Sequence, residues 1–422
     1  MRAFRYRDYR IFWTGALLSS IGSWMMNLVL PFVLYQLTQS AVWVGASVAA
    51  QFLPMVLASP LGGSIADHYP RRLVLLATQG AMGFVAGLLW LAWILQMRDP
   101  WVLLLLVGVI GLLNGIALPS WQAFVHDLVP RDVLQSAVAM NSLQINAARA
   151  VGPALAGLVL ATLGPSTAFA VNSLSFLCVV VALLLVKAGR GVRRRSADTG
   201  ITAQFLAAIR YARSQPGIVM AIGLAFILGL LGNPIFTLTV VFAESVFNVG
   251  PVQLGIMNAA LGVGAIAVAP LVGGSRFSHK IKNIAGFGLT IFGVALVAFA
   301  LSPDYVVSVA LLVVLGGCFM AVIASSNTAN QIIVADPFRG RVLALRLMAF
   351  TIAAPIGGLL QGILVDEIGA RSTVALSGAL LICLALWLVF KGGVVRLARL
   401  DDPHDEWTTE SMYRKRINSV KG

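Results

Sequence analysis

Long apolar segments recur along the whole of this chain of 422 residues. Each runs for about 20 residues or more with few charges, which is the length that an α-helix needs to cross the hydrocarbon core of a bilayer. A membrane β-strand would need only about ten residues and would alternate apolar and polar side chains, a pattern that these segments lack. We therefore predict an all-α integral membrane protein with twelve transmembrane helices. The predicted spans are 11–37, 41–66, 73–97, 101–125, 137–163, 166–187, 217–243, 252–275, 284–302, 305–334, 343–365 and 372–391.

The basic residues lie almost entirely on one side of these spans. With the N-terminus inside, all but three of the 30 Lys and Arg fall in inner segments. Arg346, which is close to the loop before the eleventh span, is counted with the inner residues. Because cytoplasmic loops are enriched in Lys and Arg, both termini are predicted to be cytoplasmic, in a bacterial inner (plasma) membrane. The net charge of +14 is therefore interpreted as a topology signal and as contact with anionic lipid headgroups, and it does not indicate nucleic-acid binding.

The composition argues against an enzyme. Only 11% of the residues are charged, compared with about 25% in ordinary soluble domains. The four histidines stand singly, the three cysteines lie inside apolar spans, and no GxxxxGK[ST] sequence is present. We expect no catalytic residue, no metal and no cofactor.

The chain divides into two similar halves. "SPLGGSIADHYPRR" at 59–72 is similar to "APLVGGSRFSHKIKN" at 269–283, and "VGPALAGL" at 151–158 is similar to "AAPIGGLL" at 353–360. Such repeats are typical of secondary transporters, which place one substrate site between two halves. The predicted domains are an N-terminal half (1–187), a cytoplasmic linker with an amphipathic helix (188–216), a C-terminal half (217–391) and a cytoplasmic tail (392–422).

Several motifs carry a resemblance to a known family. "GGSIADHYPRR" resembles the signature loop between helices 2 and 3 of the major facilitator superfamily, and "ARAVGPALAG" resembles the glycine-proline motif of helix 5 in its exporters. "FRYRDYRIFW", "LTQSAVWVG", "DLVPRDVLQSAVAMNS" and "FRGRVLAL" resemble the branch that contains macrolide efflux proteins and the enterobactin exporter. The resemblance spans nearly the entire chain. It implies the major facilitator fold and secondary active export of a small molecule by a monomer.

The loop after the second span has a predicted conformational role. Small residues such as Gly62 and Gly63 let helix backbones approach closely in membranes. Asp67 lies at the membrane surface, where a carboxylate can pair with a basic residue or cap a neighbouring helix. In the resembling family this loop latches the two halves in the outward-facing state. The resemblance assigns that role here to Gly62, Asp67, Arg71 and Arg72, with the alternative that the charges only mark a cytoplasmic turn.

Arg149 is the most informative single residue. It lies about twelve residues into the fifth span, hence about 18 Å deep, where a charge costs at least ~2.5 kcal/mol on insertion scales. No acidic residue lies comparably deep in any span. Arg149 is therefore predicted to tie helices together by donating to their carbonyls, or to bind an anionic substrate group in the cavity, or to take part in proton coupling.

A glycine-proline motif follows Arg149 and predicts a bend or a tight helix contact, because proline removes a backbone donor and glycine permits close packing. In the resembling family this motif is associated with export, and here it comprises Gly152, Pro153 and Gly157.

Polar residues at helical spacing predict the lining of a cavity, although such residues also serve as contacts between helices. In the superfamily, helices 1, 4, 7 and 10 line the central cavity. The candidates on these helices are Ser20, Trp24, Asn27, Tyr35, Asn114, Trp121, Gln122, Asn233, Thr237, Asn327, Asn330 and Gln331.

Proton antiport normally requires a carboxylate whose protonation competes with the substrate. Glu244, near the outer end of the seventh span, is the first candidate for this role. Asp127, Asp366 and Glu367 are expected to be interfacial and solvated. The first span has no acid, and Gly111 stands where proton-coupled drug exporters often carry a basic residue, which departs from a standard antiport mechanism.

The sequence as a whole predicts a secondary active exporter of amphipathic small molecules of the drug or macrolide type. The exporter is expected to be coupled to protons and to contact membrane lipids. A siderophore or another anionic metabolite is the alternative substrate, favoured by Arg149. A lipid flippase and a membrane sensor that does not transport are the alternatives from other classes.

Overall fold

A computed structural model describes residues 2–187, 201–272, 281–335 and 338–390, and all secondary structure in these ranges is helical. The predicted cytoplasmic tail, 392–422, the part 188–200 of the predicted linker and residues 273–280 in the repeat of the signature loop lie outside the described residues. The first elements are η1 (Arg2–Arg5), α1 (Arg7–Thr38), α2 (Ala41–His68), α3 (Arg71–Ile94), α4 (Pro100–Asp127), η2 (Arg131–Val133), α5 (Leu134–Thr162), α6 (Gly164–Leu185) and α7 (Ile201–Ser214). The others are α8 (Pro216–Ile227), η3 (Leu228–Gly232), α9 (Ile235–Val241), η4 (Phe242–Val246), α10 (Pro251–Val272), α11 (Ile281–Leu301), α12 (Tyr305–Ile333), α13 (Arg339–Ile368) and α14 (Ala370–Phe390).

The helices agree with the predicted spans in order and position. In the described ranges, eleven segments are long and apolar enough to cross a membrane. The ninth predicted span, 284–302, corresponds to α11, whose part from Phe287 to Leu301 is a shorter apolar helix. The chain is therefore an all-helical, multi-pass membrane protein, while the count of twelve spans stays a prediction.

Local sequence explains where several helices begin. Asp99 precedes α4 and accepts a hydrogen bond from the backbone of Trp101, and Asp304 accepts hydrogen bonds from the backbones of Val306 and Val307 at the start of α12. Such N-caps satisfy amides that have no partner within the helix. Gly369 separates α13 from α14 with a φ of 86°, which an L side chain would rarely adopt.

The seventh span is broken, where the sequence predicted one helix over 217–243. It consists of α8, a π-helical turn η3, the short helix α9 and a second π-helical turn η4. Pro234 cannot donate a hydrogen bond within the helix. Gln361 of α13 compensates, because its Nε2 donates to the carbonyls of Leu230 and Leu231 at 3.1 Å each.

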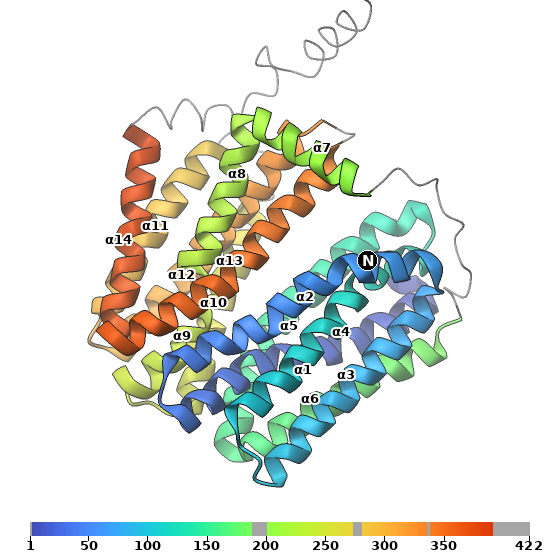
Figure 1. Cartoon of the computed structure of the whole chain (residues 1–422), viewed down its shortest axis with the longest axis horizontal. Helices are drawn as coiled ribbons and strands as arrows, with labels where there is room; N and C mark the ends of the chain where they lie inside the picture. The colour runs from blue at the N-terminus through green and yellow to red at the C-terminus, as the bar shows by residue number, and fades with distance from the viewer. Residues whose placement is uncertain (1, 188–200, 273–280, 336–337, 391–422) are drawn as a thin grey trace, which may run out of the picture.

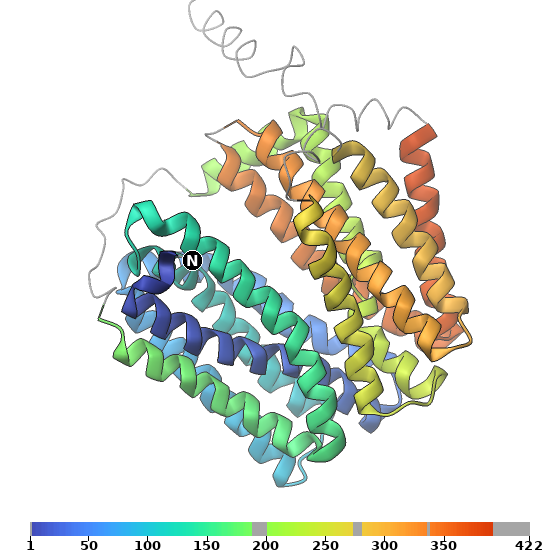
Figure 2. The ribbon, with the colours of Figure 1, turned by 180° about the vertical axis from the view of Figure 1, so that it is seen from behind.

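The helices form two groups, visible from both sides in Figures 1 and 2. The N-terminal group comprises α1–α6 and the C-terminal group α8–α14. Across the boundary between them, α2 packs on α13 and α5 packs on α10. The short helix α7 lies across the end of the C-terminal group in Figure 1, where Tyr211 stacks on Phe338 at 4.4 Å between ring centroids.

The two groups meet closely at one end of the bundle. A Cβ atom on Gly45 of α2 would lie 2.2 Å from the carbonyl oxygen of Gly358 on α13, and one on Gly157 of α5 would lie 2.5 Å from that of Pro251 on α10. We call this the closed end. The other end, which carries η1, the α2–α3 turn, η2 and α7, is the basic end.

Toward the basic end, the faces of α5 and α13 that meet the other group at the closed end become exposed. Leu143 lies two turns before Ala150 on α5, on the face that packs against α10, yet it is 52% exposed. Leu347 lies three turns before Gly358 on α13, and it is 51% exposed. The two groups therefore diverge from the closed end to the basic end, as the ribbons in Figure 1 also show.

Candidate functional site

Arg149 points into the space between the two groups. It shares a face of α5 with Val138 and Ile145, which are 48% and 41% exposed at the basic end. Val151, which is 43% exposed, lies on the opposite side of α5 at 3.6 residues per turn. Arg149 lies 15 residues after the start of α5, about 22 Å along the helix. It is thus deep within the membrane span, at an angle between the face of α5 that packs on α1 at Gly152 and the face that packs on α10 at Gly157.

The guanidinium of Arg149 stacks on an aromatic ring. Its Cζ lies 4.8 Å from the ring centroid of Trp24 on α1, which is cation–π geometry. Its Nε is buried without a hydrogen-bond partner, and no carboxylate pairs with it in the described part of the chain. A tie to helix carbonyls would have satisfied these donors, so the geometry favours a group that is ready to receive an anion.

The residues predicted to follow Arg149 make the tight contacts expected of them. A Cβ atom on Gly152 would lie 2.6 Å from the Cβ of Trp24, so Gly152 allows α5 to approach α1 beside the stacked ring. Gly157 makes the contact with α10 described above, and Pro153 is buried inside α5. This segment therefore joins the two groups at the closed end as well as positioning Arg149.

The other predicted cavity residues differ in their surroundings. Asn27 of α1 accepts a hydrogen bond from Gln51 of α2 at 3.0 Å, and Tyr35 is buried in the apolar core. Ser20 accepts a hydrogen bond from Gln144 of α5 at 3.1 Å. These three therefore bind or pack within the helices. Of the remaining candidates, Asn330 is buried. The others are partly or fully exposed, and they are Trp24, Asn114, Trp121, Gln122, Asn233, Thr237, Asn327 and Gln331.

The signature loop contacts only its own group in the interactions that the structure describes. Arg71 forms an ion pair with Asp127 of α4 at 2.9 Å, and Arg72 donates to the carbonyls of Leu183 and Leu184 on α6. Asp67 is exposed and pairs with no described residue. In this conformation the predicted latch is not engaged with the C-terminal group.

Two expectations for this region are wrong. Asp127 is not simply solvated, because it pairs with Arg71. Gly63 does not allow a close helix contact, because a Cβ atom there would meet nothing within 4 Å, whereas one on Gly62 would lie 2.6 Å from the carbonyl oxygen of Ile116 on α4. Only one of two adjacent glycines can face a given neighbour, since successive residues point 100° apart on a helix.

Carboxylates join the two groups at the closed end. Glu244 of η4 accepts a hydrogen bond from Gln36 of α1 at 2.7 Å. Asp366, near the end of α13, accepts from the hydroxyl of Ser40 and from the backbone amide of Ala41 at 2.7 Å, so it caps α2. The expectation that Asp366 is only solvated is therefore wrong. Its neighbour Glu367 is exposed, as predicted.

We expect Asp366 to hold the first turn of α2 in place. Asp366→Asn should speed hydrogen–deuterium exchange of the amides of Ala41 and Val42 about fivefold, because a capping carboxylate stabilises a helix start by about 1 kcal/mol. Peptide-level mass spectrometry of the protein in nanodiscs measures this. Glu367→Gln is the matched control and should leave the exchange unchanged. Equal exchange in the two variants would contradict the assigned role.

A second basic residue lies within the spans and was missed by the sequence analysis. Arg346 is on α13, seven residues after its start, and its Nη2 donates to Oδ1 of Asn327 on α12 at 3.0 Å. Its Nε is buried without a partner. It was counted with the inner segments although it lies three residues inside the predicted span 343–365, and α13 begins four residues before that span, at Arg339, so Arg346 lies deeper in the helix than predicted.

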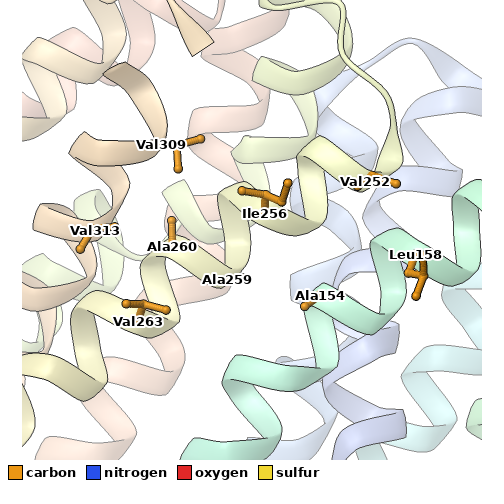
Figure 3. Close-up of a pocket in the computed structure, with 9 residues that line it drawn as sticks. All are labelled: Ala154, Leu158, Val252, Ile256, Ala259, Ala260, Val263, Val309 and Val313. Atoms are coloured by element: carbon orange, nitrogen blue, oxygen red, sulfur yellow. The ribbon is translucent and has the colours of Figure 1, made fainter. Parts of the chain in front are cut away.

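An apolar groove of about 330 Å³ follows the seam between the groups near the closed end (Figure 3). Two residues of α5 form one wall, and residues of α10 and α12 form the other. It offers no polar group to orient a ligand, and its lining suits hydrocarbon chains. The lining residues are Ala154, Leu158, Val252, Ile256, Ala259, Ala260, Val263, Val309 and Val313.

Two helical groups that close at one end, around unpaired charge inside a membrane span, define a membrane transporter. A family model described as transmembrane secretion effector matches residues 1–416, and the chain therefore belongs to this family of major facilitator superfamily transporters. It is accordingly not an enzyme. The family confirms the resemblance seen in the sequence motifs.

Curated relatives and solved structures agree with this assignment. Macrolide efflux protein A of Streptococcus pyogenes is 21% identical over 391 residues, covering 90% of this chain and 96% of the relative. The staphyloferrin A transporter of Staphylococcus aureus is 25% identical over 402 residues, covering 94% and 99%. A bacterial homologue of the human lysosomal transporter Spinster, solved in an inward-facing and unoccupied conformation, has the same fold, with a TM-score of 0.69, 16% identity and coverage of 95% and 98%.

Proposed function

We propose that this transporter exports amphipathic small molecules and that Arg149 binds an anionic group of the substrate. The observation that carries the proposal is the guanidinium of Arg149, which is stacked on Trp24, has a buried Nε without a partner and is directed between the two groups. A charge kept in a membrane span without a partner in the protein marks a substrate or ion pathway. Export agrees with the macrolide efflux protein among the relatives and with the motif at Gly152, Pro153 and Gly157.

We propose alternating access as the mechanism. The distribution of Lys and Arg supports a cytoplasmic position for the basic end, and with that orientation the described conformation would be inward-facing. The halves 1–187 and 217–391 would move as units, connected by the linker 188–216, with the tail 392–422 in the cytoplasm. Opening the outer side requires the contacts of Gly45, Asp366 and Glu244 to separate. The loop with Gly62, Asp67, Arg71 and Arg72 would then latch the inner side.

A neutral or cationic macrolide-type drug is the second candidate substrate. The side chains that support it are aromatic and amide groups at the predicted cavity, which bind apolar bodies and hydroxyl or carbonyl groups without requiring charge. These include Trp24 and Trp121, the amides Asn27, Asn114, Gln122, Asn233, Asn327, Asn330 and Gln331, and the hydroxyl of Thr237.

Transport by the purified monomer in proteoliposomes tests the proposal. Counterflow and transport driven by a pH gradient are measured with a macrolide, a lipophilic cation and a catecholate siderophore. Movement of the anionic compound alone supports the anion site. Movement of the macrolide alone supports the second candidate, and the absence of flux for every compound contradicts export in favour of a sensor. Quenching of labelled lipids in one leaflet identifies a flippase.

We propose Glu244 as the proton carrier, because it is the carboxylate that links the two groups beside α1. Glu244→Gln keeps the hydrogen-bonding capacity toward Gln36 but cannot exchange a proton. It should abolish the stimulation of transport by a pH gradient while counterflow, which needs no proton, persists. Glu367→Gln, an exposed carboxylate at the same end, should behave as wild type. Retained pH stimulation in Glu244→Gln would assign coupling to another group or another ion.

A further inference from the structure

The surroundings of Arg149 limit how an anion can reach its guanidinium. Trp24 covers one side of the guanidinium, with its ring centroid 4.8 Å from Cζ. The helices α1 and α5 meet beside this contact, because a Cβ atom on Gly152 would lie 2.6 Å from the Cβ of Trp24. The start of the Trp24 side chain is therefore held against α5, one turn away from Arg149. An anion cannot approach the guanidinium from the side that the indole occupies.

The nitrogen atoms of Arg149 differ in accessibility. Nε is buried and has no hydrogen-bond partner. Nη1 and Nη2 make no hydrogen bond to a described residue either, but they are not sealed from solvent, and the side chain as a whole is partly exposed. An oxyanion can thus bind at the end formed by Nη1 and Nη2, where both nitrogens donate in the plane of the guanidinium. This end fits one group, because its two nitrogens donate to the same bidentate oxyanion.

A second positive charge does not assist Arg149 in the described part of the membrane spans. More than one turn from the helix ends, the charged residues there are Arg149 and Arg346. Arg346 lies about 120° around α13 from Gly358, which meets the N-terminal group. It shares a face of α13 with Gly357, which packs on η3 of its own group, and it donates to Asn327. Arg149 therefore brings a single positive charge to the space between the groups.

A single arginine compensates a single negative charge. A second acidic group on a substrate would stay unpaired inside the membrane span, where an uncompensated charge is costly. A neutral head group would leave the charge of Arg149 and its open donors without a matching acceptor. The best match in free energy is therefore one oxyanion with one negative charge on an apolar body.

We propose that the site at Arg149 selects one singly charged oxyanion, so that the substrate is a lipophilic monocarboxylic acid, and that Trp24 is the residue that imposes this selection. The carboxylate binds at Nη1 and Nη2. The indole of Trp24 excludes a second acidic group from the side of the guanidinium that it covers. This inference rests on the proposed role of Arg149 and deepens it, because it specifies the charge and the head group of the substrate.

Binding of decanoate, decanamide and octylmalonate to the full chain in nanodiscs tests the inference. Octylmalonate is decanoate with a second carboxylate on the α carbon, and decanamide carries no charge. We expect wild type to bind decanoate about tenfold more tightly than either of the other compounds, because these leave a charge or donors unpaired. Radiolabelled decanoate in a scintillation proximity assay, competed by the other two compounds, measures all three affinities. Empty nanodiscs give the background from partitioning into lipid.

Variants of Trp24 test whether this residue imposes the selection. Trp24→Leu should reduce the preference for decanoate over octylmalonate about fivefold, because the opened side of the guanidinium offers a donor to the second carboxylate. Trp24→Phe keeps a ring beside the guanidinium and should restore most of the preference. Trp90→Leu, at an exposed tryptophan of α3, should change nothing. A merely structural role of Trp24 would weaken all three compounds equally, and this result would overturn its assignment.

The outcomes for wild type separate this inference from the proposed function and need no variant to fold. Binding of octylmalonate as tight as that of decanoate, or tighter, would overturn the charge selection and leave Arg149 as an anion site. Equal binding of decanoate and decanamide would instead contradict the proposed function and, with it, this inference. An unchanged preference for decanoate over decanamide in Arg149→Gln would do the same.

Discussion

Arg149→Gln is expected to reduce transport of an anionic substrate by about 10- to 100-fold. A hydrogen bond to a charged group contributes about 1.5–3 kcal/mol, and each 1.4 kcal/mol is a factor of ten. The loss should be in substrate affinity, because the variant keeps the shape of the site beside Trp24 and Gly152. Equilibrium binding together with counterflow in proteoliposomes measures it.

Thermal unfolding separates the binding role from a structural tie. An arginine that binds substrate and has no partner in the protein is costly to bury in the membrane, so Arg149→Gln should keep or raise the unfolding temperature. A tie to helix carbonyls would lower it by several degrees. Arg149→Lys provides the matched comparison, because it keeps the charge but loses the planar fork and the stacking on Trp24. Full transport by Arg149→Gln would remove Arg149 from the site.

Gly45→Ala is expected to shift the protein strongly away from the described conformation. The added methyl group would lie 2.2 Å from the carbonyl oxygen of Gly358, so α2 and α13 must separate at the closed end. Overpacking of this kind costs about 1–3 kcal/mol, which corresponds to a population shift of about 5- to 140-fold. Transport should fall by a similar factor, because alternating access needs both conformations.

Spin-label distances report the shift directly. Labels at Leu163 and Val306, both exposed at the closed end, should move apart in Gly45→Ala. Labels at Tyr69 and Gly340, at the basic end, should approach, as expected if the loop with Asp67 latches the halves. Gly63→Ala is the control on the same helix, because a Cβ atom there meets nothing within 4 Å. Unchanged distances in Gly45→Ala would mean that this contact does not limit the equilibrium.

The distribution of unpaired charge is the physical basis of the transport hypothesis. Two arginines lie within membrane spans without a carboxylate partner in the described residues, while the carboxylates Glu244 and Asp366 lie at the closed end in hydrogen bonds between the groups. Arg149 therefore makes the space between the groups positive, and the contacts at the closed end are acidic. A substrate anion would enter from the basic end along a favourable potential.

The sequence by itself determined the order and the approximate positions of the long helices, while the count of twelve spans stays a prediction. In the bilayer every backbone amide and carbonyl must be hydrogen-bonded within the protein. An apolar run of about 20 residues therefore forms an α-helix. The sequence also singled out Arg149, since a charge so far from any loop stands out without knowledge of its neighbours. It located the loop at Gly62–Arg72 and the segment at Gly152–Gly157 as places of special packing.

Only the tertiary structure decided which side chains meet. Asp366 and Glu367 are adjacent acids and both are exposed, yet only Asp366 caps α2, because the rotation of α13 directs only its side chain toward the N-terminal group. The same reason separates Gly62 from Gly63 and brings Arg346 to Asn327. Helical periodicity describes the relative angles within one helix, but which neighbour occupies each angle depends on the packing of all the helices together.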